Sequence, residues 1–244
     1  MKNILKYPGA KNRIANWICS YMPEHNVYLE PYAGSLAVFF HKEPCHIETI
    51  NDLDGEVVNF YRILREHCEE LVCRIGLTPY ARTEYVKAYE QCEDDIERAR
   101  RFCVRCWMGF GCGNLYRNGF KSGQQSHSPN PAKAWAKLPE TMLYASERLK
   151  GVQIENLPAV ELIKRYDTQD VFMYLDPPYL QGLRKKHLYK CEMEDREHKE
   201  LLEIVDKHPG KVLLSGYDND LYNDMLHGWN KVQKVTQAEG GKKE

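Results

Sequence analysis

The sequence lacks any long apolar segment. Of its 244 residues 43% are apolar and 28% are charged, and no uninterrupted apolar run approaches the ~20 residues that a membrane-spanning helix requires. The first residues, Met1 to Leu5, are followed at once by polar residues and by Pro8-Gly9, so the apolar core of a signal peptide is absent too. We therefore expect a protein of the cytoplasm with no membrane partner.

The sequence also lacks the cysteine spacing of a small disulfide-bonded secreted fold. Its nine cysteines are odd in number and scattered among apparent helices and strands, so we expect reduced and mostly buried thiols. Cys103 and Cys106 are spaced as zinc ligands often are, with Cys112 and His127 further along. The pair lies in a helical pattern without a second closely spaced pair, so we expect no metal site.

One stretch lacks acidic residues altogether. The net charge of the chain is only −1, yet no Asp or Glu occurs in the 42 residues from Arg98 to Pro139. The basic residues of this window are Arg98, Arg100, Arg101, Arg105, Arg117, Lys121, Lys133 and Lys137. Such a window predicts a surface that contacts nucleic-acid phosphates.

The tetrapeptide Asp176-Pro177-Pro178-Tyr179 carries the clearest chemical signal. It follows a run over residues 171–175 that favours a strand, so we place it at a strand's carboxyl end, where open α/β sheets bind ligands. Asp176 and the Pro177 carbonyl are adjacent acceptors, neither proline has an N–H, and Pro178 restricts the Pro177 backbone. These acceptors suit the NH₂ group of a flat molecule such as adenine, whose face Tyr179 would cover. From the residues alone, a turn that merely ends a buried strand is the alternative.

The chain before this point alternates between strands and helices. We predict a helix over residues 11–22, a strand over 27–31, and a turn over 32–35 that leads into a helix through Phe40. A second strand over 47–50 ends at an Asp-rich turn. Asp52 lies there about twenty residues after the small-residue turn, where an acid of a nucleotide-binding fold accepts hydrogen bonds from ribose. Asp54 is explained as the N-cap of a helix that follows it.

Residues 80–150 interrupt the alternation. Helical patterns over 82–108 and 131–150 flank a glycine-rich loop over 109–123 in which aromatic and basic residues alternate. Its aromatic residues Phe110, Tyr116 and Phe120 are candidates to stack on bases. Arg117 and Lys121 are candidates to contact phosphates or base edges. A mobile surface loop is the alternative.

The last third returns to alternation. We predict strands over 152–156 and 211–215, helices over 158–166, 201–205 and 221–226, and a further strand from Trp229 to Val235. Arg184 and Lys185 lie in a basic segment that either closes over a nucleotide or forms an exposed loop.

Four further motifs, in order along the chain, resemble those of the DNA adenine-N6 methyltransferases, whose catalytic motif is DPPY. They are Lys6-Tyr7-Pro8-Gly9-Ala10-Lys11, Glu30-Pro31-Tyr32-Ala33-Gly34-Ser35, Asn51-Asp52-Leu53-Asp54 and Leu214-Ser215-Gly216-Tyr217-Asp218. The resemblance covers most of residues 4–240. It implies an α/β fold, a Rossmann-like methyltransferase sheet with an inserted helical DNA-recognition subdomain. The methyltransferase domain would comprise residues 1–79 and 151–244, and the insert residues 80–150.

The resemblance also implies S-adenosylmethionine (SAM) as cofactor and double-stranded DNA as substrate. Tyr7 and Lys11 would contact the methionine end of SAM and Asp52 its ribose. Other implied cofactor contacts are Glu30, Pro31, Ala33, Gly34, Ser35 and Asp176. The expected DNA contacts are Arg117, Asn118, Lys121, Arg184 and Lys185. Many relatives place an acid for the cofactor's adenine where this chain has Leu157 and Pro158, which leaves Asn156 as a weak candidate.

The implied reaction is methyl transfer from SAM to the N6 atom of a flipped-out adenine, with Asp176, Pro177, Pro178 and Tyr179 as catalytic residues. We expect a monomer, in a restriction-modification setting with a cognate endonuclease. Methylation of RNA or of a protein amide, and a catalytically silent DNA-binding subunit, are the alternatives. The family continues past its Gly-Gly-Lys turn with one more strand, whereas this chain stops at Glu244. We therefore expect either a truncated chain or a sheet one strand short, with Val232 and Val235 poorly covered.

Overall fold

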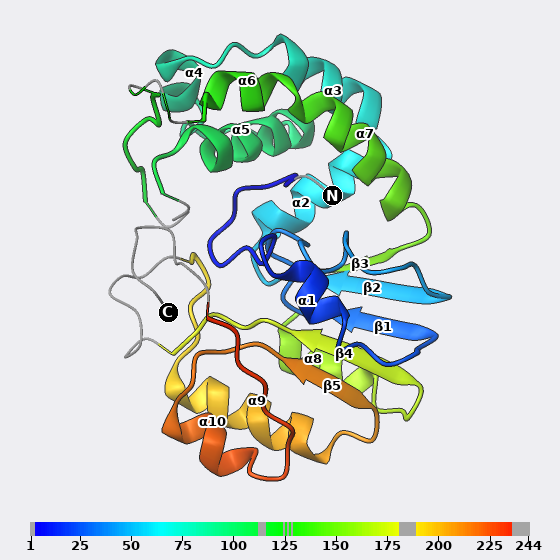
Figure 1. Cartoon of the computed structure of the whole chain (residues 1–244). Coiled ribbons are helices and arrows are strands. Elements are labelled where there is room, and N and C mark those ends of the chain that lie inside the picture. The colour runs from blue at the N-terminus through cyan, green and yellow to red at the C-terminus, as the bar shows by residue number, and fades with distance from the viewer. Residues whose placement is uncertain are drawn as a thin grey trace.

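A five-stranded parallel sheet organises the molecule. The computed structural model describes residues 3–111, 116–123, 125, 127, 129–180 and 189–235 (Figure 1). The strands are β1 (Val27–Glu30), β2 (Ile47–Asn51), β3 (Gln153–Glu155), β4 (Val171–Leu175) and β5 (Lys211–Leu214), in the spatial order β3-β2-β1-β4-β5. Val27 of β1 pairs with Ile47 of β2 on one side and Val171 of β4 on the other. The strand order therefore reverses between β1 and β4, and their carboxyl ends are where such sheets bind ligands.

Alternation along the central strands divides the core between two faces of the sheet. Tyr28, Phe172 and Tyr174 belong to one apolar cluster, whereas their neighbours Leu29 and Met173 belong to another. The helices α8 (Ala159–Arg165) and α9 (Asp195–Lys207) contribute buried residues to the second cluster. A short α10 (Asp220–Met225) packs on α9. The sheet is thus covered on both faces, as a parallel sheet requires.

The first cluster continues into a group of helices that we call the helical layer, α3–α7 (Figure 1). Two helices lie nearer the sheet, α1 (Ala15–Cys19) and α2 (Gly55–Glu66). The helical layer comprises α3 (Cys68–Leu77), α4 (Arg82–Lys87), α5 (Asp95–Met108), α6 (Pro131–Ala136) and α7 (Leu138–Leu149). Trp107 of α5 donates its indole N–H to the Ile4 carbonyl at 2.8 Å, which ties the layer to the N-terminal segment. Cys103 and Cys106 of α5 are buried in this shared core.

Side-chain caps explain where several helices begin. The Asp54 carboxylate accepts a hydrogen bond from the Glu56 N–H, as expected for the N-cap of α2. Asp94 caps α5 in the same way, and Asn130 caps α6. The caps hold these starts in place because each satisfies an N–H group that has no partner within its helix. None of the helices in the described part of the chain is both long and apolar enough to span a membrane.

Four of the predicted elements are wrong in detail. The helix expected through Phe40 is a series of turns, because Leu36 has φ = 53° and so leaves the helical region. The two long helical patterns of the insert are each divided, into α4 and α5 and into α6 and α7. Residues 229–235 form no strand. Val232 and Val235 are exposed, and the five-stranded sheet as described has β5 at its edge.

Candidate active site

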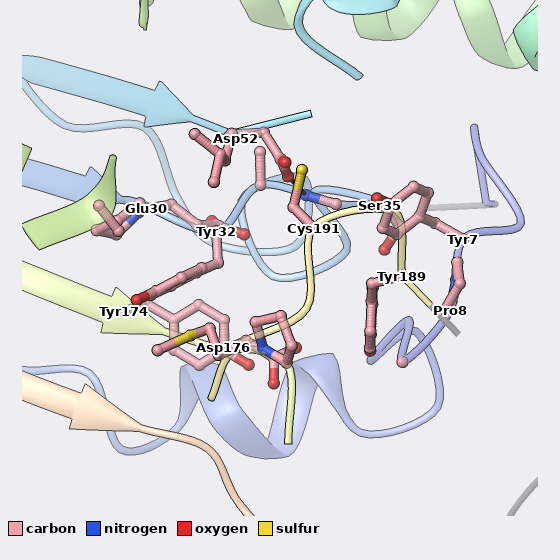
Figure 2. A pocket seen from close by; sticks show the side chains of 18 of the residues that line it. Tyr7, Pro8, Glu30, Tyr32, Ser35, Asp52, Tyr174, Asp176, Tyr189 and Cys191 are labelled. Atoms are coloured by element: carbon pink, nitrogen blue, oxygen red, sulfur yellow. Dashed lines mark hydrogen bonds between the residues drawn. The ribbon is translucent and has the colours of Figure 1, made fainter. Parts of the chain in front are cut away.

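A cavity of about 390 Å³ lies at the carboxyl ends of β1 and β4. Figure 2 shows Asp52 and Cys191 on one side of it, Asp176 on the other, and Tyr7, Pro8 and Tyr189 at one end. The N-terminal loop, the turn after β1, the start of α8 and residues 189, 191, 192 and 193 also line it. Segments that are far apart in sequence therefore enclose one space at the point where the strand order reverses.

The turn after β1 requires glycine at position 34. Gly34 has φ = 45°, and a Cβ atom there would lie 3.1 Å from Cδ1 of Tyr7. The Gly34 N–H donates to Oδ2 of Asp52 at 2.8 Å, and the Gly34 carbonyl accepts from the Tyr61 hydroxyl at 3.1 Å. The missing side chain thus lets the buried Tyr7 ring lie against the turn and form the cavity wall.

Asn51 joins three loops beneath the cavity. Its side-chain N–H₂ donates to the carbonyls of Pro31 and Leu157 at 2.9 and 3.0 Å, and its Oδ1 accepts from the Leu157 N–H at 2.8 Å. The amide is suited to this position because it both donates and accepts. Sequence reasoning quoted Asn51 within a motif but assigned it no role, since the three loops meet only in the folded chain.

The two acids after β2 have different roles. Asp52 lines the cavity, and its carboxylate accepts from the backbone N–H groups of Gly34 and Asp54. Burial raises the pKa of Asp52 to about 6, although those hydrogen bonds oppose the rise. Asp54 is the buried N-cap described above and is absent from the cavity wall. This placement agrees with the choice of Asp52 as the candidate ligand-binding acid.

The catalytic candidate Asp176 is paired with Lys11. The Lys11 ammonium lies 2.7 Å from Oδ2 of Asp176, 2.7 Å from the Gly9 carbonyl, and 4.9 Å from the centre of the Tyr179 ring. Burial raises the pKa of Asp176, and Lys11 and Tyr179 oppose that rise. The Oδ1 atom of Asp176 is buried and accepts no hydrogen bond of normal geometry from the described residues. A nitrogen cation thus lies between a carboxylate and an aromatic ring, and one acceptor atom is still unused.

Glu30 is the most strongly buried acid of the cavity. It ends β1, is 2% exposed, and accepts a hydrogen bond from the Tyr28 hydroxyl at 2.6 Å. Burial raises the pKa of Glu30 to about 8, and the nearby charge of Asp176 adds to the rise. The side chain is therefore mostly protonated at neutral pH and reduces the negative charge beside Asp176.

Comparison with known proteins identifies the family of this chain. The family model of D12 class N6 adenine-specific DNA methyltransferases matches residues 7–239. The chain belongs to this family. It is similar to the Type II methyltransferase M.MjaIII of Methanocaldococcus jannaschii, with 24% identity over 96% of this chain and 91% of that protein. It is also similar to the Type II methyltransferase M1.LlaDCHI of Lactococcus lactis subsp. cremoris, with 29% identity over 74% of this chain and 66% of that protein. The protein is therefore an adenine-specific DNA methyltransferase, as the motifs implied.

The structure of this methyltransferase brings most of the predicted cofactor residues together. Those that line the cavity are Tyr7, Lys11, Glu30, Pro31, Ala33, Gly34, Ser35, Asp52 and Asp176. Of the other DPPY residues, Pro178 also lines it, while Pro177 is buried and lies outside the lining. Tyr179 packs edge-on against Tyr217, with ring centres 4.5 Å apart.

Sequence reasoning missed Tyr174, Tyr189 and Cys191, which also line the cavity. A Cβ atom on Gly9 would lie 2.3 Å from the Tyr189 hydroxyl, so the Pro8-Gly9 turn and Tyr189 fit each other closely. No local pattern announces this contact. Asn156, the weak adenine candidate, donates to the Asp52 carbonyl at 2.7 Å and so helps to fix the loop after β2.

The acid-free window of the methyltransferase is only partly a DNA-binding surface, and the prediction was wrong for its first four arginines. Arg98 pairs with Asp95, Arg105 with Glu56, and both Arg100 and Arg101 pair with Glu97. These acids lie outside the window in sequence but next to it in space. The four guanidinium groups therefore serve packing within the protein rather than an open phosphate-binding face.

The loop after α5 presents the remaining candidates. Arg117 is exposed, and Lys121 is half-buried and forms no ion pair among the described residues. The Asn118 carbonyl accepts from the Tyr85 hydroxyl at 2.7 Å. Phe110 and Tyr116 are exposed, as stacking on bases would require. Phe120 is half-buried and packs on Tyr80, so its stacking on bases stays a prediction. Arg184 and Lys185 lie outside the described residues.

Proposed function

We propose that this methyltransferase binds SAM in the cavity and methylates the N6 atom of an adenine that has left the DNA duplex. The observation that carries the proposal is the surroundings of Asp176. Its Oδ2 holds the Lys11 ammonium at 2.7 Å, its Oδ1 is buried and accepts no hydrogen bond of normal geometry from the described chain, and the Tyr179 ring lies beside the ammonium. An amino group with two hydrogens and a flat ring matches the same three features.

The residues of the cavity fit SAM. Asp52 offers a carboxylate for ribose hydroxyls, Lys11 a cation for the methionine carboxylate, and Tyr7 an aromatic wall. The cavity wall also includes Pro158, Ala159 and Val160, so apolar contact would hold the adenine of SAM where many relatives use an acid. When bound, SAM supplies a methyl group activated by a positively charged sulfur. Glu30, mostly protonated at neutral pH, would limit the negative charge beside Asp176.

Asp176 would act by accepting hydrogens from the adenine amino group. The lone pair of N6 is spread into the base, so the enzyme must favour the pyramidal form of the nitrogen as the methyl group arrives. Acceptors at Asp176 and the Pro177 carbonyl favour that form by holding both hydrogens, and alignment of the reacting groups supplies much of the rate. Lys11 must first leave Oδ2. Its move to the methionine carboxylate would free this acceptor when the cofactor binds.

We further propose that residues 80–150 recognise the target between the two parts of the methyltransferase domain, 1–79 and 151–244. Arg117, Asn118 and Lys121 would contact double-stranded DNA, and the target adenine would flip out at a cost of a few kcal/mol. The helix α3 packs against α5 and α7, and this contact attaches residues 80–150 to the methyltransferase domain. Because the relatives named above are Type II methyltransferases, we propose a restriction-modification role with a cognate endonuclease. We expect a monomer that acts in the cytoplasm, where bacterial and archaeal DNA is found.

Expression in a host without DNA methylation tests the proposal. Sequencing of modified bases should find N6-methyladenine within one short DNA motif, and Asp176→Ala should leave the host DNA unmodified. Purified enzyme should bind SAM in calorimetry before DNA is added. Absence of methylated adenine with the folded wild-type enzyme and SAM would reject the proposed reaction.

The DNA contacts are tested separately. The double variant Arg117→Ala with Lys121→Ala should bind DNA more weakly, and the slope of log affinity against log salt should fall by up to about 0.9 per lost phosphate contact. SAM affinity should be unchanged. Reduced SAM binding with an unchanged salt slope would show that this loop has been assigned wrongly.

A further inference from the structure

A row of aromatic side chains connects α4 to the loop that follows α5. The ring centres of Tyr80 and Phe120 are 5.3 Å apart, those of Phe120 and Tyr85 6.0 Å, and those of Tyr85 and Tyr89 5.3 Å. We call these four residues the aromatic row. The Tyr80 hydroxyl donates to the Lys121 carbonyl at 2.7 Å and so anchors the loop further. Both segments lie at the same end of the helical layer (Figure 1).

Two arginines lie on this row. The Cζ atom of Arg82 is 4.9 Å from the centre of the Phe120 ring, and that of Arg117 is 6.0 Å from the Tyr89 ring. Both arginines are exposed, and neither has a carboxylate within ion-pair distance among the described residues. They differ in this from the other arginines of the helical layer. The ion-paired arginines there are Arg74, Arg98, Arg100, Arg101, Arg105 and Arg148.

Among the described residues, no carboxylate pairs with Arg82. Glu84 lies two residues further along α4, but its Oε2 atom is 3.0 Å from Nη1 of Arg100, which engages that carboxylate. A guanidinium that lies on an aromatic ring keeps its N–H groups free around the rim, and the ring restricts its plane. Arg82 is exposed beside the Phe120 ring, and the fork of donors on its guanidinium suits two acceptors lying side by side.

We propose that Arg82, held on Phe120, contacts DNA next to Arg117 and belongs to the recognition surface of this methyltransferase. The proposal rests on the proposed assignment of residues 80–150 to target recognition. Paired acceptors of the required kind occur on phosphate groups and on the O6 and N7 atoms of guanine. Sequence analysis did not find Arg82 because it precedes the acid-free window and is followed by Glu84.

The experiment compares Arg82→Ala with Lys87→Ala. Both remove one positive charge from the exposed surface of α4, but Lys87 lies five residues further on and therefore on another side of the helix. DNA affinity is measured at several salt concentrations on a duplex that carries the motif found by sequencing. We expect Arg82→Ala to weaken binding roughly 10- to 100-fold, as for the loss of one bidentate contact, and Lys87→Ala to change it less than about twofold.

Two further readouts identify the acceptor. If Arg82 contacts guanine, the Arg82→Ala enzyme should accept more than one base at one position of the motif, and the salt slope should not change. A phosphate contact predicts the same motif and a salt slope lower by about 0.9. Arg82→Lys should restore most of the affinity in the phosphate case only, because lysine keeps the charge but not the planar fork. Phe120→Leu, if it melts like the wild type, should weaken binding in the same direction.

The outcomes separate this inference from the proposed function. Arg82→Ala with the affinity, salt slope and motif of Lys87→Ala would overturn the inference, while sensitivity of the Arg117 and Lys121 double variant would leave the recognition assignment standing. Failure of the wild-type enzyme to bind DNA would overturn both. Equal SAM affinity in all variants confirms that each has kept its fold.

Discussion

The pKa values of the acids in the cavity and of Glu97 in the helical layer are shifted in opposite directions. In the cavity, burial raises the pKa of Glu30 to about 8 and that of Asp52 to about 6, and it also raises the pKa of Asp176. In the helical layer, hydrogen bonds from Arg100 and Arg101 lower the pKa of Glu97 to about 2. Both regions are well packed, so the difference lies in the partners provided rather than in burial alone.

The difference separates residues kept for function from residues used for stability. Glu97 has arginine partners that satisfy its carboxylate, so the pair contributes to the fold. Asp176 has a buried oxygen that accepts no hydrogen bond of normal geometry from the described chain, an arrangement that costs stability unless a ligand completes it. Buried acids with raised pKa values at the carboxyl ends of β1, β2 and β4 thus mark the site more clearly than charge counts do.

The largest effect that tests this comparison concerns Asp176. We expect Asp176→Ala to reduce single-turnover methyl transfer by roughly 100- to 1,000-fold or more, the range for loss of one key polar group in an active site. Asp176→Asn should fail comparably, because its amide presents a donor where an acceptor is needed. Thermal unfolding serves as the control for the fold. Wild-type single-turnover rates in either variant would remove the central claim.

The next effect concerns the pH dependence of stability at Glu30. The folded pKa is raised to about 8 from 4.5, so the stability from Glu30 is complete below about pH 4.5 and is lost as the pH rises toward 8. Glu30→Gln has no carboxyl group to titrate at this position. The free energy of unfolding of the variant, compared with that of the wild type, should therefore increase by on the order of 3 kcal/mol between about pH 5 and pH 7.

Urea unfolding at these two pH values measures the Glu30 effect. Glu43→Gln, a change at an exposed acid between β1 and β2, is the matched control and should show no such trend. A pH-independent difference between Glu30→Gln and the wild type would mean that Glu30 titrates normally in the folded chain.

A smaller effect is expected when the two acids that follow β2 are each replaced by alanine. Asp52→Ala should weaken SAM binding by ~1–3 kcal/mol, the range for a lost charged hydrogen bond. Asp54→Ala removes the N-cap of α2 and should cost about 1 kcal/mol of stability without weakening SAM binding. Calorimetry with both variants is decisive. Equal SAM affinity for Asp52→Ala and the wild type would exclude the ribose role.

An effect on stability of similar size, without an effect on methyl transfer, is expected in the helical layer. Glu97→Gln should lower stability at neutral pH by roughly 1–3 kcal/mol through its weakened arginine contacts, with methyl transfer retained. Because the folded pKa of Glu97 is lowered from 4.5 to about 2, its contribution is present above about pH 4.5 and is lost as the pH falls toward 2.

Unfolding at several pH values checks the Glu97 trend. Glu147→Gln is the matched control, since Glu147 is 69% exposed and pairs, among the described residues, only with the exposed Lys150, so its effect should be close to zero. A loss for Glu97→Gln that is constant from neutral to acidic pH would contradict the lowered pKa.

Local sequence determined much of this methyltransferase. The apolar run over 171–175 and the Pro-Pro step fixed the end of β4, and the spacing of Asp54 fixed the start of α2, because strand alternation, capping and proline geometry act within a few residues. The order of the motifs was sufficient to identify the family, and most of the residues it implied do line the cavity.

Only the tertiary structure decided which charged side chains form ion pairs within the protein and which remain available to bind a ligand. Lys11 and Asp176 are 165 positions apart in the sequence, and Arg105 and its partner Glu56 are 49 positions apart. No periodicity in the sequence could therefore predict either ion pair. The same limit explains why four basic residues of the acid-free window proved to be paired with acids of the protein, while Arg82, two residues before Glu84, has no carboxylate partner in the described chain. Ion pairing and burial depend on distance through space, whereas a sequence pattern records only distance along the chain.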